Sequence, residues 1–136
     1  DEKLKRWACT EDIDMSYRIH RRHPGTLYAT PYARLIHAHS DTSRLSGELQ
    51  IYMTTVYRLY FFYKNIEQSL RNKIAFTWGA FGALMVELGV AAEERKKRGI
   101  WRVVYLLRSY LYSVRHLGRL RKGDLSFFDA ILRAVG

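Results

Sequence analysis

The chain is poor in cysteine and proline, with one cysteine (Cys9) and two prolines among its 136 residues. A single thiol can form neither an internal disulfide nor a cysteine metal cluster, which excludes a disulfide-stapled secreted scaffold and fits a reducing compartment. Charged residues run directly into Trp7, so we expect no secretory leader. A sequence that begins at Asp1 in this way suggests a piece of a longer polypeptide.

Negative charge is also scarce, because 13 acidic residues face 23 lysines and arginines, for a formal charge of +10. Residues 41–136 contain 16 of the basic and 8 of the acidic residues, so most of the excess lies there. Such an excess favours a polyanionic partner, which can be nucleic acid, anionic lipid or a nucleotide diphosphate. A solvated basic surface without a partner is equally compatible with it. No helix-turn-helix, zinc or RNP-type signature indicates nucleic acid.

The spacing of apolar residues predicts a mainly α chain that begins with one short helix and two short strands. Thr10 is a predicted N-cap, and turn residues at 23–25 end the first helix. After a polar loop at 40–43, three to four helices make up the basic second part. The predicted helices span about 11–21, 45–66, 70–92, 100–116 and 125–134, and the predicted strands span 26–30 and 33–38.

The stretch 74–92 needs a comparison with membrane-spanning segments. It contains 19 residues and one charge, Glu87, and its length is close to that needed to cross a bilayer. Its uncharged run before Glu87 is shorter than a span, and it includes Gly79 and Gly82, so a buried or interfacial helix is favoured over a spanning one. The aromatic residues within 57–63 suit either a headgroup interface or an ordinary core.

The densest polar cluster in the sequence is Thr10-Glu11-Asp12-Ile13-Asp14. A carboxylate at a helix start is exposed and kept ionised by the helix dipole, which is what a general base for a hydroxyl proton requires. We therefore single out Asp12 as a candidate catalytic base. The alternative is that these acidic residues only stabilise the helix start. Asp14 and Arg18 are four residues apart and are expected to pair.

Two further patterns could suggest a metal. Asp12-Ile13-Asp14 spells the D-x-D of metal-diphosphate sites, but residues two apart on a helix point to nearly opposite sides, so we reject that assignment. His37 and His39 are expected to face the same side of a strand, where imidazoles can bind a divalent ion. No carboxylate pair or cysteine nearby completes such a site, so one histidine completing a site built elsewhere is the simpler interpretation.

The order W-x-x-T-E-D-x-D-x-x-x-R, followed by Y-x-x-x-x-x-A-R-L-I-H and a polar loop, resembles family 2 glycosyltransferases of the GT-A fold. These residues are Trp7, Thr10 to Asp14, Arg18, Tyr28, Ala33 to His37 and Asp41 to Ser43. The segment Tyr57 to Asn65 is similar to the Y-x-x-x-(K/R)-N segment that opens the helical tail of rhamnosyltransferase-like members. The resemblance covers about residues 7–73.

The resemblance implies that residues 1–43 are the C-terminal end of a GT-A α/β catalytic domain, and that residues 44–136 are a helical extension. It places the catalytic base at Asp12 and acceptor-sugar contacts at Trp7 and Glu11. It places a ligand of a divalent cation, Mg²⁺ or Mn²⁺, at His37, and it assigns no role to His39. The nucleotide-binding half and its D-x-D have no counterpart here, so we expect the 136-residue chain alone to be inactive.

The implied parent transfers a sugar, with inversion, from a nucleotide-sugar donor to a hydroxyl of a glycan or lipid-linked acceptor, as in cell-surface polysaccharide synthesis. A cytoplasmic enzyme resting on the inner face of a membrane is expected, with basic residues of 95–98 and 115–122 toward anionic lipid. The competing interpretation is a small basic helical module without catalysis that binds nucleic acid or a membrane surface.

Overall fold

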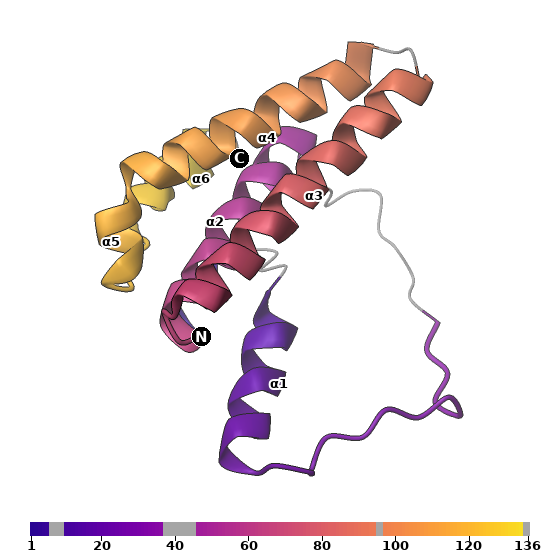
Figure 1. Ribbon diagram of the computed structural model, residues 1–136, viewed down its shortest axis with the longest axis vertical. Coiled ribbons are helices and arrows are strands. Elements are labelled where there is room, and N and C mark those ends of the chain that lie inside the picture. Colours follow the sequence, from indigo (N-terminus) through magenta and orange to yellow (C-terminus); the bar gives the residue numbers. More distant parts are fainter. Residues whose placement is uncertain (6–9, 37–45, 95–96, 135–136) are drawn as a thin grey trace.

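The computed structural model describes residues 1–5, 10–36, 46–94 and 97–134, without the side chains of residues 94, 97, 98 and 134. This part of the chain contains six α-helices and one short 3-10 helix, η2, arranged as a helical bundle with α1 at its side (Figure 1). The elements are α1 Glu11–Arg22, α2 Gly47–Asn65, α3 Leu70–Glu94, α4 Lys97–Arg115, α5 Leu117–Arg121, η2 Ser126–Phe128 and α6 Asp129–Ala134.

The two predicted strands are wrong as far as the described residues extend, because residues 26–36 form no strand. A strand needs a partner for its backbone N–H and C=O groups, and a two-stranded hairpin alone is marginal in water. The side chains here are also exposed, with Tyr28 at 88% and Ile36 at 95%, so no core face holds the segment extended. Its aromatic and β-branched composition favours strands only where a sheet exists to receive them.

The helical part of the prediction is confirmed, although the helix count differs. Helices α1 to α4 lie within a few residues of the predicted ranges. The expected three to four helices after residue 44 are five in the described chain, since a short α5 follows α4 at His116 and the predicted 125–134 helix is η2 followed by α6. Gly123, at φ +72°, supplies the left-handed turn that separates α5 from η2.

The core lies between one face of α2 and the C-terminal elements α5, η2 and α6. Edge-to-face packing of Tyr57 on Phe128, with ring centroids 5.7 Å apart, lies at its centre. Burial of this aromatic face answers the question left by the composition of 57–63: Tyr57, Tyr60 and Phe62 are core residues. The buried residues that pack together in the main cluster of this core are Leu49, Met53, Val56, Tyr57, Leu59, Tyr60, Leu120, Leu125, Phe127, Phe128 and Leu132.

Helix α4 packs against α2 through small hydroxyl residues. Ser109 is fully buried, and its Oγ donates to Thr55 Oγ1 at 2.9 Å. Thr55 and Ser113 in turn donate to backbone carbonyls one turn earlier in their own helices, at 2.9 and 2.8 Å. The hydroxyls of Thr55, Ser109 and Ser113 therefore all have partners.

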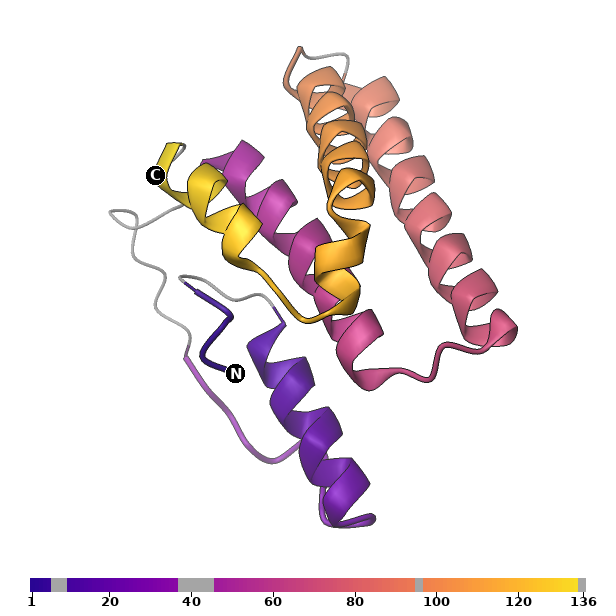
Figure 2. The same cartoon turned by 90° about the vertical axis from the view of Figure 1, so that its left-hand side faces the viewer.

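Helix α3 lies at the outer edge of the bundle beside α4 (Figure 2). Within the described residues it is the one helix long and apolar enough to cross a membrane, over Leu70–Glu93, yet no residue of its most apolar window is buried inside the protein. Helix α3 contacts α2 through Phe76, whose ring centroid lies 4.4 Å from the ring centroid of Phe62. The predicted stretch 74–92 is therefore not the buried core helix that such composition usually indicates.

The turn between α3 and α4 depends on one close approach. A Cβ added at Gly99 would lie 2.6 Å from the Cα of Ala91, whereas one added at Gly79 would meet nothing within 4 Å. Gly99 is therefore required by the packing of the two helices, while Gly79 merely weakens α3.

We expect Gly99→Ala to lower the free energy of unfolding by about 1–3 kcal/mol, because the helices must separate to admit the methyl group. Gly79→Ala, the matched control, should raise it by about 0.5–1 kcal/mol through helix propensity. Urea denaturation followed by circular dichroism measures both. Equal effects of the two substitutions would show that α3 and α4 do not meet at Gly99.

Candidate functional site

The first turn of α1 presents Glu11 and Asp12 to solvent. Thr10 is the N-cap residue, as predicted, but it is buried and its side chain makes no capping hydrogen bond. The first backbone N–H groups of a helix carry the positive end of its dipole, which favours ionised carboxylates beside them. The position suits a solvent-accessible base, and it equally suits acids that only stabilise the helix.

Asp14, by contrast, is buried, with 2% of its surface exposed. Lys64 Nζ and Asn65 Nδ2, at the end of α2, each donate to Asp14 Oδ1 at 2.8 Å. A buried carboxylate is tolerated only when charges and donors surround it, and these two residues supply both. Asp14 is therefore the residue that attaches α1 to α2.

Tyr17 strengthens the same attachment from α1, whereas Arg18 pairs with Asp14 within α1. Arg18 Nε lies 3.0 Å from Asp14 Oδ2, which confirms the predicted pair, although its N–H is aimed at the Asp14 backbone carbonyl at 3.4 Å. Tyr17 donates its hydroxyl to the Asn65 carbonyl at 2.9 Å and packs edge-on to Phe61. The Asn65 carbonyl is one of the last in α2, so Tyr17 satisfies a group that the helix itself leaves unpaired.

Lys64 also bridges to the first residue of the chain. Its Nζ lies 2.7 Å from Asp1 Oδ2, which also accepts a hydrogen bond from the Tyr60 hydroxyl at 2.7 Å. Burial and the charge of Asp14 raise the pKa of Tyr60, so it remains a neutral donor. Lys64 therefore sits between two carboxylates and links α1, α2 and the N-terminal segment into one polar cluster.

The pKa of Asp14 reflects this cluster. Burial alone would raise the pKa, but hydrogen bonds from Lys64 and Asn65, together with the charges of Lys64 and Arg18, outweigh burial and hold the pKa below its ordinary value of 3.8. Asp14 is thus ionised at neutral pH and has no role that requires it to take up a proton.

The two aspartates of the D-x-D sequence are used differently. Asp12 is exposed, whereas Asp14 points into the cluster with Lys64, so the two carboxylates do not converge. No group of three or more histidine, cysteine or acidic residues among the described residues could hold a metal ion. The Asp12 and Asp14 carboxylates are therefore not arranged as a pair of ligands.

The remaining predicted site residues lie where the structure gives no description. Trp7, the proposed acceptor contact, and His37, the proposed cation ligand, both lie outside the described residues, as does His39. The structure therefore gives no distance from any of these three residues to Asp12.

Sequence reasoning missed Lys64 and Asn65 as partners of Asp14. They stand about fifty positions away, so no local spacing predicts the contact. One signal in the sequence could have suggested the contact. Both the acidic segment of α1 and the segment that ends at Lys64-Asn65 resemble glycosyltransferase segments, and the structure brings the two together.

Comparison with known proteins gave no match to any family model, to any curated protein or to any solved structure.

We expect Asp14→Asn to lower the free energy of unfolding by about 1–3 kcal/mol at neutral pH, because Lys64 and Arg18 lose their anionic partner. Lys64 and Arg18 are partly exposed, so solvent limits the loss. Asp12→Asn is the control, and its loss of a favourable dipole interaction should cost less than about 1 kcal/mol. Chemical denaturation measures both.

The same contact predicts a pH dependence. Because the folded pKa of Asp14 is depressed, its stabilisation is complete above the unfolded value of 3.8 and is lost as the pH falls through the folded pKa. The difference in unfolding free energy between the original chain and Asp14→Asn should therefore shrink below pH 3.8. A constant difference across that range would contradict the ion-pair account.

Proposed function

We propose that this chain is the acceptor-activating part of an inverting family 2 glycosyltransferase, with Asp12 as the general base. The observation that supports this is that the two aspartates of α1 have different environments, one buried and one exposed. Asp14 is buried against Lys64 and Asn65, which fixes the helix, while Asp12 two residues away remains exposed. A base must combine a fixed backbone with a free carboxylate, and α1 offers that combination.

The second support is that the two segments on which the resemblance rests form one cluster. Asp14 and Arg18 come from the acidic segment, and Lys64 and Asn65 end the segment that opens the helical part. Contact between two segments that resemble the same family at separate places in the sequence strengthens the resemblance. The same contact would also hold α1 on α2 in a noncatalytic helical module, so the resemblance of both segments, and not the contact alone, favours the transferase.

In the proposed step, an Asp12 carboxylate oxygen takes the proton of an acceptor hydroxyl. The hydroxyl oxygen then forms a bond to the anomeric carbon of the donor sugar as the bond to the nucleoside diphosphate breaks, which inverts the configuration. Glu11, exposed beside Asp12, and Trp7 would contact the acceptor sugar. The donor contacts belong to residues outside this chain.

A divalent cation, Mg²⁺ or Mn²⁺ with His37 as one ligand, would stabilise the departing diphosphate. The described residues supply no ligand set for it.

Asp12→Asn in a polypeptide that also contains the donor site should lower kcat for sugar transfer by about 10²–10⁴-fold, the usual contribution of a general base. The assay is transfer from uridine- or thymidine-diphosphate sugars to membrane-extracted acceptors. The thermal unfolding midpoint of the Asp12→Asn variant should change little, because the Asp12 side chain is exposed.

Glu11→Gln is the neighbouring control, and it should raise KM for the acceptor with a smaller effect on kcat. Unchanged kcat in Asp12→Asn, in protein that is fully folded by circular dichroism, would refute the assignment of the base.

A further inference from the structure

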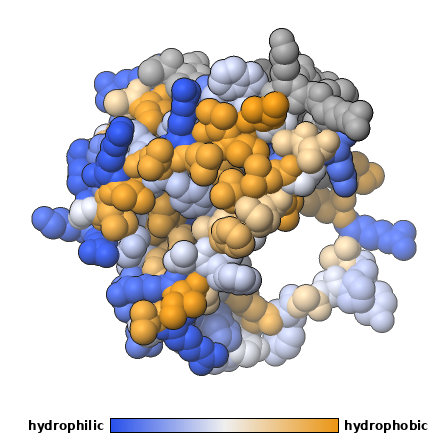
Figure 3. Space-filling view, turned by 45° about the horizontal axis from the view of Figure 1, so that its top comes forward, coloured by the Kyte–Doolittle hydropathy of each residue, from blue (hydrophilic) through white to orange (hydrophobic). Residues whose placement is uncertain are grey.

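Helix α3 exposes a broad apolar surface along its length. Its outward side chains retain between 36% and 75% of their accessible surface, a range that soluble proteins rarely tolerate over one whole helix. Apolar side chains gather on the face of the molecule shown in Figure 3. The exposed apolar residues of α3 are Leu70, Ile74, Trp78, Phe81, Met85, Val86, Leu88 and Val90.

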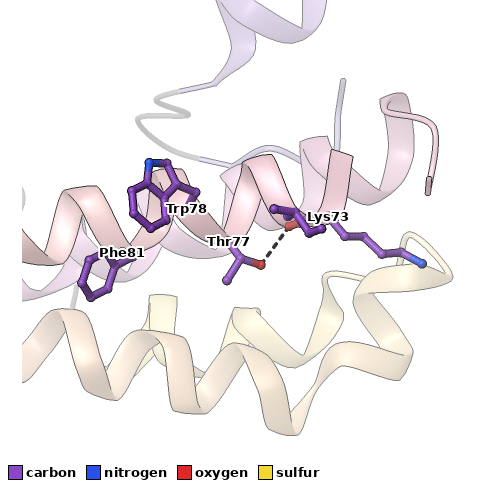
Figure 4. Close-up of a pocket in the computed structure, with 5 residues that line it drawn as sticks. Lys73, Thr77, Trp78 and Phe81 are labelled. Atoms are coloured by element: carbon purple, nitrogen blue, oxygen red, sulfur yellow. Dashed lines mark hydrogen bonds between the residues drawn. The ribbon is translucent and has the colours of Figure 1, made fainter. Parts of the chain in front are cut away.

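An open apolar depression lies near the start of this surface, lined by Lys73, Ile74, Thr77, Trp78 and Phe81 (Figure 4). Thr77 donates its hydroxyl to the Lys73 carbonyl at 2.9 Å, so its polar group is satisfied within the helix. The aromatic rings of Trp78 and Phe81 lie one turn apart, with centroids 5.7 Å from each other. The surface is therefore without an unpaired hydroxyl that would need water.

Packing inside the protein uses only a narrow side of α3. Arg102 of α4 makes a two-pronged ion pair with Glu87, at 2.7 and 2.8 Å, and neutralises the acidic residue in the middle of the apolar stretch. Gly99 brings the start of α4 against Ala91. These contacts hold α3 along α4 and leave its apolar side turned away from the bundle.

Cations lie at one end of this surface. Arg71 and Lys73 are exposed in the first turn of α3. Trp78 lies near the Arg71 and Lys73 end, in the order that interfacial helices show: a basic end, an aromatic ring and then aliphatic side chains. The charge complements an anionic headgroup layer.

We propose that α3 lies along the surface of an anionic lipid bilayer, with the side that carries Ile74, Trp78 and Phe81 inserted at the boundary between headgroups and acyl chains. This inference stands independently of the proposed transferase. It goes beyond the expected basic contact of residues 95–98 and 115–122, because it assigns binding to an apolar helix face.

The breadth of the surface favours lipid over a second copy of the chain or a partner helix. A helix that packs on another helix needs only a narrow apolar stripe. On α3, Val86 and Val90 are exposed in addition to the stripe of Ile74, Trp78 and Phe81. A fluid apolar phase covers such a breadth without requiring shape complementarity.

The pairing of α3 with α4 favours a helix lying in the surface over one that crosses the bilayer. If α3 crossed while α4 stayed packed along it, Arg108 near the middle of α4 would enter the hydrocarbon region, where a charge is costly. In the surface orientation, neither helix has to cross the hydrocarbon region, so this cost does not arise.

The first experiment follows Trp78 in vesicles. The full 136-residue chain with Trp7→Phe and Trp101→Phe retains Trp78 as its one tryptophan. We expect it to bind vesicles containing phosphatidylglycerol, to shift its fluorescence to the blue, and to be quenched more by bromines near the headgroup than by bromines near the chain end. Stronger quenching at the chain end would overturn the surface orientation.

The second experiment compares matched charge insertions. Ile74→Asp and Phe81→Asp should each lower the vesicle partition coefficient by about ten- to a hundredfold, the loss expected for one large apolar side chain. Leu35→Asp is the control, because Leu35 is 87% exposed outside the helices, and it should leave partitioning unchanged. Circular dichroism checks that all three variants remain helical.

Two outcomes would refute lipid insertion. Vesicle binding lost entirely at high salt, with no blue shift of Trp78, would show electrostatic adsorption only. Dimers in sedimentation that Phe81→Asp dissociates, without vesicle binding, would assign the surface to a second copy. Both outcomes leave the Asp12 proposal untouched, since they do not involve α1.

Discussion

The contact of one buried carboxylate with the end of a long helix determines how the N-terminal part of the structure is arranged. Asp14 is almost fully enclosed, and it is held there by Lys64 and Asn65 at hydrogen-bonding distance. A buried charge without such partners would be strongly unfavourable, so α1 docks where these donors lie. The exposure of Asp12 follows from this docking, because a helix that buries one position turns the position two residues away outward.

Much of the helical architecture could be predicted from the sequence, because helices depend on local spacing. The positions of α1 to α4 follow from apolar residues three and four apart and from polar residues between them. The pairing of Asp14 with Arg18 was predictable for the same reason, since both lie on one helix face. The contact with Lys64 was not, because it joins residues that only the fold brings together.

The prediction of two strands was wrong because strands, unlike helices, depend on distant parts of the chain. Residues 26–36 have the composition of strands, but a strand is not a local structure, and its hydrogen bonds must come from a neighbour. The environment of α3 was also beyond a pattern-based prediction. Its apolar content resembles that of a core helix, and only the folded structure shows that α2 packs against the less apolar α4 while α3 remains outside. The predicted acceptor contact Trp7 and the predicted cation ligand His37 lie outside the described residues, so their roles stay predictions.

The seam between α2 and α4 has a consequence for the environments in which the bundle can persist. Its central contacts are hydroxyl groups of Thr55, Ser109 and Ser113 with partners already in place, and the side chains are small. Cohesion of this kind comes from close van der Waals approach and satisfied polar atoms, and it does not require water as the surrounding medium. At this point the association of α2 and α4 therefore depends less on expelling water than the apolar core around Tyr57 and Phe128 does.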